Sequence, residues 1–141
     1  MLTFQYDKYK IEVRNDSMYT PGSADNSFQY DFIYTDKDSI LYQASKHGIK
    51  VYKYEELYQS AIVCAVGGAT GVYDHSAIVD TDSIYICCAN KVFSMALPDL
   101  TLNWIVQTDH ITCFSIYSAA TVFFTHGELQ VSKLDRNDTI I

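Results

Sequence analysis

The sequence is poor in positive charge and has no long apolar run. Among 141 residues there are 10 Lys and Arg against 17 Asp and Glu, and the formal net charge is −7. This balance argues against binding to nucleic acids or anionic membranes, because both need a basic patch. The two longest apolar runs, residues 61–66 and 84–89, are far shorter than the roughly 20 residues that cross a bilayer. We therefore expect neither a nucleic-acid nor a membrane partner.

Sequence signatures of enzymes and cofactor sites are also missing. The sequence contains no P-loop, no G-x-G-x-x-G, no G-x-S-x-G and no H-E-x-x-H pattern. Four cysteines lie in apolar runs without C-x-x-C spacing, which predicts buried, reduced thiols, with a reactive thiol or a metal ligand as the alternative. They are Cys64, Cys87, Cys88 and Cys113. With no apolar segment of the signal-peptide kind near the start, we expect a cytoplasmic protein that has no metal or cofactor and is not an enzyme.

What is present indicates β-structure. Apolar residues make up 48% of the chain, which includes 12 Tyr and 7 Phe, and aromatic residues favour strands. Apolar residues alternate in one phase over 2–6 and in the other over 9–13, which predicts a strand pair, or one bulged strand, over residues 2–14. Residues 15–27 have the composition of a loop. We therefore expect a single, antiparallel all-β domain over residues 1–141.

Three stretches, residues 38–66, 82–106 and 121–141, repeat one pattern after the N-terminal strands and loop of residues 1–32. Each stretch has an apolar strand, a polar break, a second strand, an acidic turn and a third strand. The corresponding positions Ser39, Ser83 and Thr121 lie 44 and 38 residues apart. The pattern predicts three related β units, whose last strands include residues 102–106 and 139–141.

These units resemble the blade repeats of β-propellers of the pyrroloquinoline-quinone-enzyme-like type. In such blades the second strand ends in Leu-Asp and the third in Trp; Leu97-Pro98-Asp99 through Trp104 follows this pattern best, and Leu134-Asp135 begins it again. The first unit departs from it, because Tyr54-Glu55-Glu56 stands where Leu-Asp is expected. The resemblance covers about residues 38–141 and implies blade-like sheets.

Three units are too few for a closed ring, since propellers close with about four to eight blades. The resemblance therefore implies an incomplete, propeller-like structure: a fragment, an open stack of sheets, or an oligomer built from several copies. An antiparallel sandwich is the alternative. Residues 54–66 also leave a short helix open, because Leu57, Ala61 and Cys64 have helical spacing.

The candidate ligand-binding residues are centred on the one glycine-rich stretch. This stretch is either a connector between units or a ligand-binding loop. Further candidates are the neighbouring acid and histidine, the single tryptophan and a second histidine–acid pair at a turn. The full set is Gly67, Gly68, Gly71, Asp74, His75, Trp104, His126 and Glu128.

Other readings of these residues stay open. Trp104 is either a core residue or a ligand contact. Asp74, His75 and Ser76 have the residue types of a hydrolase, but neighbours on an extended chain point to alternate faces. The tyrosines of residues 52–58 are either the alternating residues of a half-solvated sheet or a protein-binding surface.

We expect a non-catalytic interaction module that binds another protein through loops or sheet edges. Unpaired edges also favour self-association into a homodimer or larger assembly. The first alternative is a small-ligand or sugar-binding domain that uses residues 67–76 and Trp104. The second is a hydrolase that uses Asp74, His75 or His126.

Overall fold

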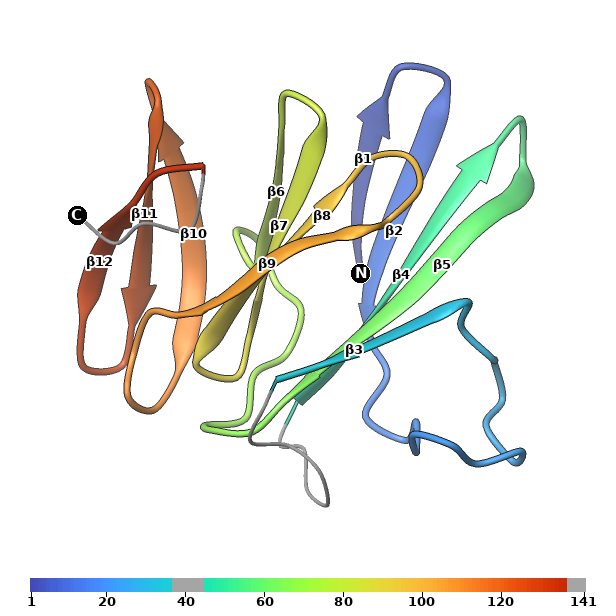
Figure 1. Cartoon of the computed structure of the whole chain (residues 1–141), viewed down its shortest axis with the longest axis horizontal. Coiled ribbons are helices and arrows are strands. Elements are labelled where there is room, and N and C mark those ends of the chain that lie inside the picture. Colours follow the sequence, from blue (N-terminus) through green and yellow to red (C-terminus); the bar gives the residue numbers. More distant parts are fainter. Residues whose placement is uncertain (37–44, 137–141) are drawn as a thin grey trace.

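The computed structural model describes residues 1–36 and 45–136, and all regular structure in this part of the chain is β-strand. The all-β prediction is confirmed. The described strands form three sheets that lie side by side (Figure 1). Their bounds are β1 Leu2–Tyr6, β2 Tyr9–Asn15, β3 Phe32–Thr35, β4 Ser45–Lys53, β5 Glu56–Ala65, β6 Ala77–Asp80, β7 Ser83–Cys88, β8 Lys91–Ala96, β9 Leu102–Gln107, β10 Cys113–Ala119, β11 Val122–Gly127 and β12 Val131–Leu134.

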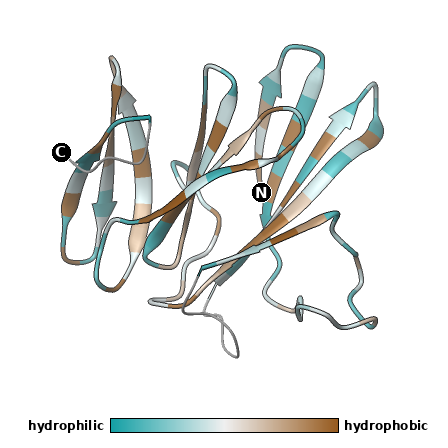
Figure 2. Ribbon diagram, viewed as in Figure 1, coloured by the Kyte–Doolittle hydropathy of each residue, from teal (hydrophilic) through white to brown (hydrophobic). Residues whose placement is uncertain are grey.

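The N-terminal sheet has the order β1-β2-β4-β5-β3, and all its pairs are antiparallel except β3 with β5. The middle sheet, β6-β7-β8-β9, and the C-terminal sheet, β10-β11-β12, are antiparallel meanders in which each strand pairs with the next. No sheet closes on itself within the described residues. Figure 2 shows polar and apolar residues alternating along β1, β2 and β4, as expected for a sheet with one solvated face.

The two longest apolar runs form strands that are buried on both faces. In β7, alternate residues face either the core shared with the N-terminal sheet or the core shared with the C-terminal sheet. In the second half of β5, one face packs in the first of these cores and the other lies under Tyr19 and Tyr30 of the loop that joins β2 to β3. A strand without a solvent face loses its polar alternation, which explains why these segments read as continuous apolar sequence.

The short helix considered for residues 54–66 is wrong, because residues 56–65 form β5. This strand pairs with β4 on one side and with β3 on the other, so its backbone groups bond to neighbouring strands. The helical spacing of Leu57, Ala61 and Cys64 is outweighed by tertiary pairing and by the β-branched residues between them.

The other predicted strands can be compared where the structure describes them. Residues 2–14 form the hairpin β1–β2 rather than one bulged strand, and residues 102–106 lie in β9. The strands predicted at residues 38–42 and 139–141 lie outside the described residues. In the described part of the chain no helix is long and apolar enough to cross a membrane.

Candidate functional site

The glycine-rich segment packs tightly against Ile111 and Thr112. The Gly68 N–H donates to the Ile111 carbonyl oxygen at 2.6 Å, and a Cβ at Gly68 would lie 1.8 Å from the Thr112 Oγ1 atom. Thr70 turns inward, and its N–H donates to the Ser45 Oγ atom at 2.7 Å. Glycine is therefore required at position 68 because the two loops pack closely there.

The remaining predicted site residues are spread over the middle and C-terminal sheets. Asp74 and His75 are exposed, and the His75 ring lies 4.6 Å from the ring of Tyr117. The Trp104 Nε1–H donates to the Arg136 carbonyl oxygen at 2.9 Å, and its ring packs beside Tyr85. Trp104 therefore makes its contacts away from the glycine segment.

Only part of the predicted set comes together. The Thr112 hydroxyl donates to the Glu128 Oε2 atom at 3.1 Å, so Gly68 and Glu128 meet the same residue. His126 is exposed on β11. No three His, Cys, Asp or Glu side chains of the described residues group closely enough to hold a metal ion.

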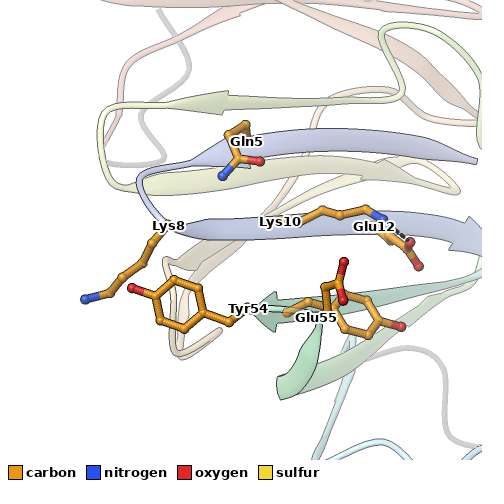
Figure 3. A pocket seen from close by; sticks show the side chains of 7 residues that line it. Gln5, Lys8, Lys10, Glu12, Tyr54 and Glu55 are labelled. Atoms are coloured by element: carbon orange, nitrogen blue, oxygen red, sulfur yellow. Dashed lines mark ion pairs between the residues drawn. The ribbon is translucent and has the colours of Figure 1, made fainter.

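A second surface gathers exposed aromatic side chains at the ends of the hairpins β1–β2 and β4–β5. Side chains of both hairpins surround a hollow of about 520 Å³ (Figure 3). A second hollow, of about 440 Å³, adjoins it along β4 and β5, and Tyr54 lines both. We call the residues around the two hollows the tyrosine surface: Gln5, Lys8, Lys10, Glu12, Tyr52, Lys53, Tyr54, Glu55, Glu56, Leu57 and Tyr58.

Strand register places only part of this set on the outer face of the N-terminal sheet, because Lys53 pairs with the buried Tyr9 and the Tyr58 ring contacts Tyr9. Lys10 of β2 lies opposite Tyr52 of β4, whereas the next pair, Ile11 and Val51, is buried in the core. The Lys10 ammonium also forms an ion pair with the Glu12 carboxylate at 3.2 Å. Figure 3 shows Lys8 and Tyr54 at one end of the hollow and the Lys10–Glu12 pair along β2.

The turn between β4 and β5 holds Tyr54 in an unusual backbone conformation. Lys53 pairs with Glu56, so the loop consists of Tyr54 and Glu55 alone, with φ values of 52° and 69°. Positive φ at both central residues is the requirement of a type I′ turn, for which Asn-Gly is the usual sequence. A bulky residue in this region costs about 1 kcal/mol or more. The Tyr54 side chain remains 75% exposed despite this cost.

Contacts with Asp99 and Tyr9 hold the Tyr58 side chain in place. Its hydroxyl donates to the Asp99 Oδ1 atom at 2.8 Å, and its ring centroid lies 5.2 Å from that of Tyr9. The hydrogen bond to the Asp99 carboxylate raises the pKa of the Tyr58 hydroxyl, so the phenol stays neutral. Tyr58 is thus held by both contacts and remains 43% exposed.

The charge of this region differs from that of the rest of the chain. Residues 1–15 and 45–59 contain six of the 10 Lys and Arg residues but only four of the 17 Asp and Glu residues. The segments that carry the tyrosine surface are therefore net positive in a chain of net charge −7, whereas the surface itself has three lysines and three glutamates. No His, Cys or Ser lines either hollow.

Sequence reasoning singled out the tyrosines of this surface but not its charged residues. Gln5 pairs with Lys10 across the hairpin, and Lys10 and Glu12 alternate with apolar residues along β2; this alternation was the signal available in the sequence. Their meeting with Tyr52 depends on the pairing of β2 with β4, which has no local signature.

Comparison with known proteins identifies no relative of this chain. No family model matches the chain, and no curated protein matches its sequence.

Proposed function

We propose that this chain is a non-catalytic interaction module that binds another protein through the tyrosine surface. The observation that carries this proposal is Tyr54, which is largely exposed on a left-handed turn between two hollows. Strained backbone persists where the surrounding structure or a function requires it, and it is concentrated at binding sites. Tyrosine is also enriched at protein interfaces and among the residues that dominate their affinity.

The shape of the surface favours a protein partner over a small ligand. Small-molecule sites are concave and bury about 70–90% of a drug-sized ligand. The hollows here lie at the ends of two hairpins; Tyr54, which lines both, is 75% exposed, and Leu57 of the second is 46% exposed. A broad, partly apolar surface with charges of both signs at its rim suits a protein contact.

The charge distribution indicates the chemistry of the partner. An acidic segment is attracted by the lysines of β2 and β4 and repelled by the rest of the chain, which carries most of the carboxylates. Such asymmetry steers association toward one face and rejects other orientations. The partner is therefore a protein with an acidic segment that carries apolar side chains for the two hollows.

Site-specific photo-cross-linking tests this function. A photoreactive amino acid replaces Tyr54 in one variant and Tyr73, which is exposed to the same extent (75% and 74%), in the control. We expect cells that make the Tyr54 variant to yield one cross-linked protein with an acidic segment, in an amount that falls as salt rises.

Two outcomes contradict the proposal. The first is equal cross-linking of the same proteins from both positions, which indicates nonspecific contact. The second is a cross-link only to a second copy of this chain, because the partner is then the chain itself.

A further inference from the structure

Two buried thiols meet between the middle and C-terminal sheets. Cys87 of β7 and Cys113 of β10 are 1% and 0% exposed, and their Sγ atoms are 3.2 Å apart. Both belong to the apolar cluster that joins these sheets, together with residues such as Ile116 and Phe123. In sequence the two cysteines are 26 residues apart, so only the stacking of the sheets brings them together.

Backbone hydrogen bonds hold both cysteines in place. The Cys113 N–H donates to the Ala89 carbonyl oxygen at 2.7 Å, and the Cys87 N–H donates to the Ser76 carbonyl oxygen at 2.8 Å. A disulfide has an S–S distance of about 2.0 Å, so the two sulfur atoms need to approach by only about 1 Å. The pair is therefore arranged for bond formation without a large movement of either sheet.

The other two thiols have different surroundings. The Cys88 Sγ atom points toward the carbonyl oxygens of Ser45 and Val63, at 3.5 and 3.7 Å. Cys64 lies in the small cluster under the loop that joins β2 to β3. These two residues provide internal controls, because they are as deeply buried as Cys87 and Cys113.

We propose that Cys87 and Cys113 form a redox-active dithiol that a small hydroperoxide oxidises to a disulfide between the middle and C-terminal sheets. Hydrogen peroxide is the probe of this class. In the reduced protein the two thiols pack as apolar side chains. In the oxidised protein a covalent bond joins β7 to β10.

The chemistry proceeds in two balanced steps. The Cys113 thiol first ionises, and its thiolate attacks one peroxide oxygen; the S–O bond forms, the O–O bond breaks, and the hydroxide that leaves combines with the proton released on ionisation to give water. The sulfur loses two electrons, the peroxide gains them, and Cys113 is now a sulfenic acid. The Cys87 sulfur then attacks the Cys113 sulfur; the S–S bond forms, the S–O bond breaks, and the departing hydroxide takes the Cys87 proton as water. In total two thiols and one peroxide give one disulfide and two waters.

The hydrogen bond between the two thiols determines which sulfur reacts first. It raises the pKa of the Cys87 thiol and lowers that of Cys113. The proton therefore stays on Cys87, and Cys113 supplies the thiolate, which is the reactive form. Cys87 is then the resolving thiol.

Burial limits the oxidant to small molecules and slows the reaction. Neither sulfur is exposed, so peroxide reaches the pair only when the C-terminal sheet opens locally. Bulky disulfide reagents need a larger opening and react more slowly still.

The experiment compares the reduced protein before and after exposure to hydrogen peroxide. We expect the intact mass to fall by two hydrogen atoms, and a digest to contain a reducible cross-link between the peptides of Cys87 and Cys113. The bond closes a loop of 26 residues, so the melting temperature should rise by about 10 °C and return after reduction.

Three variants make the test specific. Cys87→Ser and Cys113→Ser should abolish the cross-link, whereas Cys64→Ser should leave it intact. Cys87→Ser should also retain a sulfenic acid on Cys113 that a dimedone-type probe captures. A cross-link that contains Cys64 or Cys88, or oxidation of all four cysteines at one rate, overturns the proposal. So does an unchanged melting temperature after complete formation of the Cys87–Cys113 bond.

Discussion

A single buried histidine makes the stability of this chain depend on pH in the mildly acidic range. His47 of β4 is fully buried, and its Nε2 atom lies 2.9 Å from the Thr70 Oγ1 atom. Burial lowers the pKa of the His47 ring from 6.5 to about 4, and a backbone hydrogen bond at Lys46 offsets only part of this effect. The folded state therefore holds the ring neutral through most of the acidic range.

The sign and size of the effect follow from the two pKa values. In the unfolded chain His47 takes up a proton near pH 6.5, whereas the folded chain resists protonation until about pH 4. The unfolded state thus binds more protons in this window, and the stability contributed by the neutral ring is lost as pH falls through it. The full difference between the two pKa values corresponds to a stability contribution of about 3 kcal/mol, at 1.36 kcal/mol per pKa unit. About three quarters of this contribution is lost by about pH 4.5.

Urea denaturation of the wild type and of His47→Gln at about pH 7.5 and about pH 4.5 measures this contribution. Glutamine does not titrate, so the variant reports the pH dependence of all other groups. We expect the wild type to lose about 2.5 kcal/mol more than the variant between these pH values. Equal losses in the two proteins would refute the reasoning, because His47 would then titrate alike in the folded and unfolded states.

Three further substitutions test particular contacts. The Asp109 carboxylate accepts hydrogen bonds from four backbone N–H groups of two loops, so Asp109→Asn should lower the free energy of unfolding by about 2 kcal/mol, measured by urea denaturation at neutral pH. Lys91 forms a buried ion pair with Asp36 at 2.8 Å, and Lys91→Met should cost about 3 kcal/mol in the same assay; a change below about 1 kcal/mol would contradict this assignment. Replacing Tyr54 and Glu55 by Asn and Gly should stabilise the turn by about 1 kcal/mol, seen as a higher melting temperature, and should abolish partner cross-linking from a photoreactive residue at position 58.

Strand patterning was the most predictable part of this fold. Alternation located β1 and β2, and the repeated pattern placed β9. The continuous apolar runs correspond to strands covered on both faces. The helix alternative at residues 54–66 arose in such a run, where burial on both faces removes the alternation that identifies a strand.

Turns were harder to predict, because several tight hairpins lack the residues that usually mark them. Asp7, Thr81, Ala89 and Ala120 adopt positive φ at two-residue loops in which glycine is usual. Glycine is instead required where chains pack closely: a Cβ at Gly48 would lie 2.1 Å from the Tyr30 hydroxyl oxygen. The glycine-rich segment, which the sequence left open as a connector or a ligand-binding loop, packs closely at Gly68 against Ile111 and Thr112.

Contacts between strands and between sheets could not be predicted from the local sequence. The meeting of Cys87 with Cys113, of His47 with Thr70, and of Lys10 with Tyr52 depends on how the strands pair and the sheets stack. Sequence reasoning could name the tyrosines of the surface, but it could not supply their neighbours.

The two proposals concern opposite ends of the molecule and should be independent. The tyrosine surface lies at the hairpin ends of the N-terminal sheet, whereas the Cys87–Cys113 pair lies between the middle and C-terminal sheets (Figure 1). The middle sheet between them is buried on both faces, and its core is too densely packed to deform gradually. Oxidation should therefore raise the melting temperature without changing the yield of cross-linked partner at Tyr54. A change in that yield would show that the disulfide alters the packing of the middle sheet against β4 and β5.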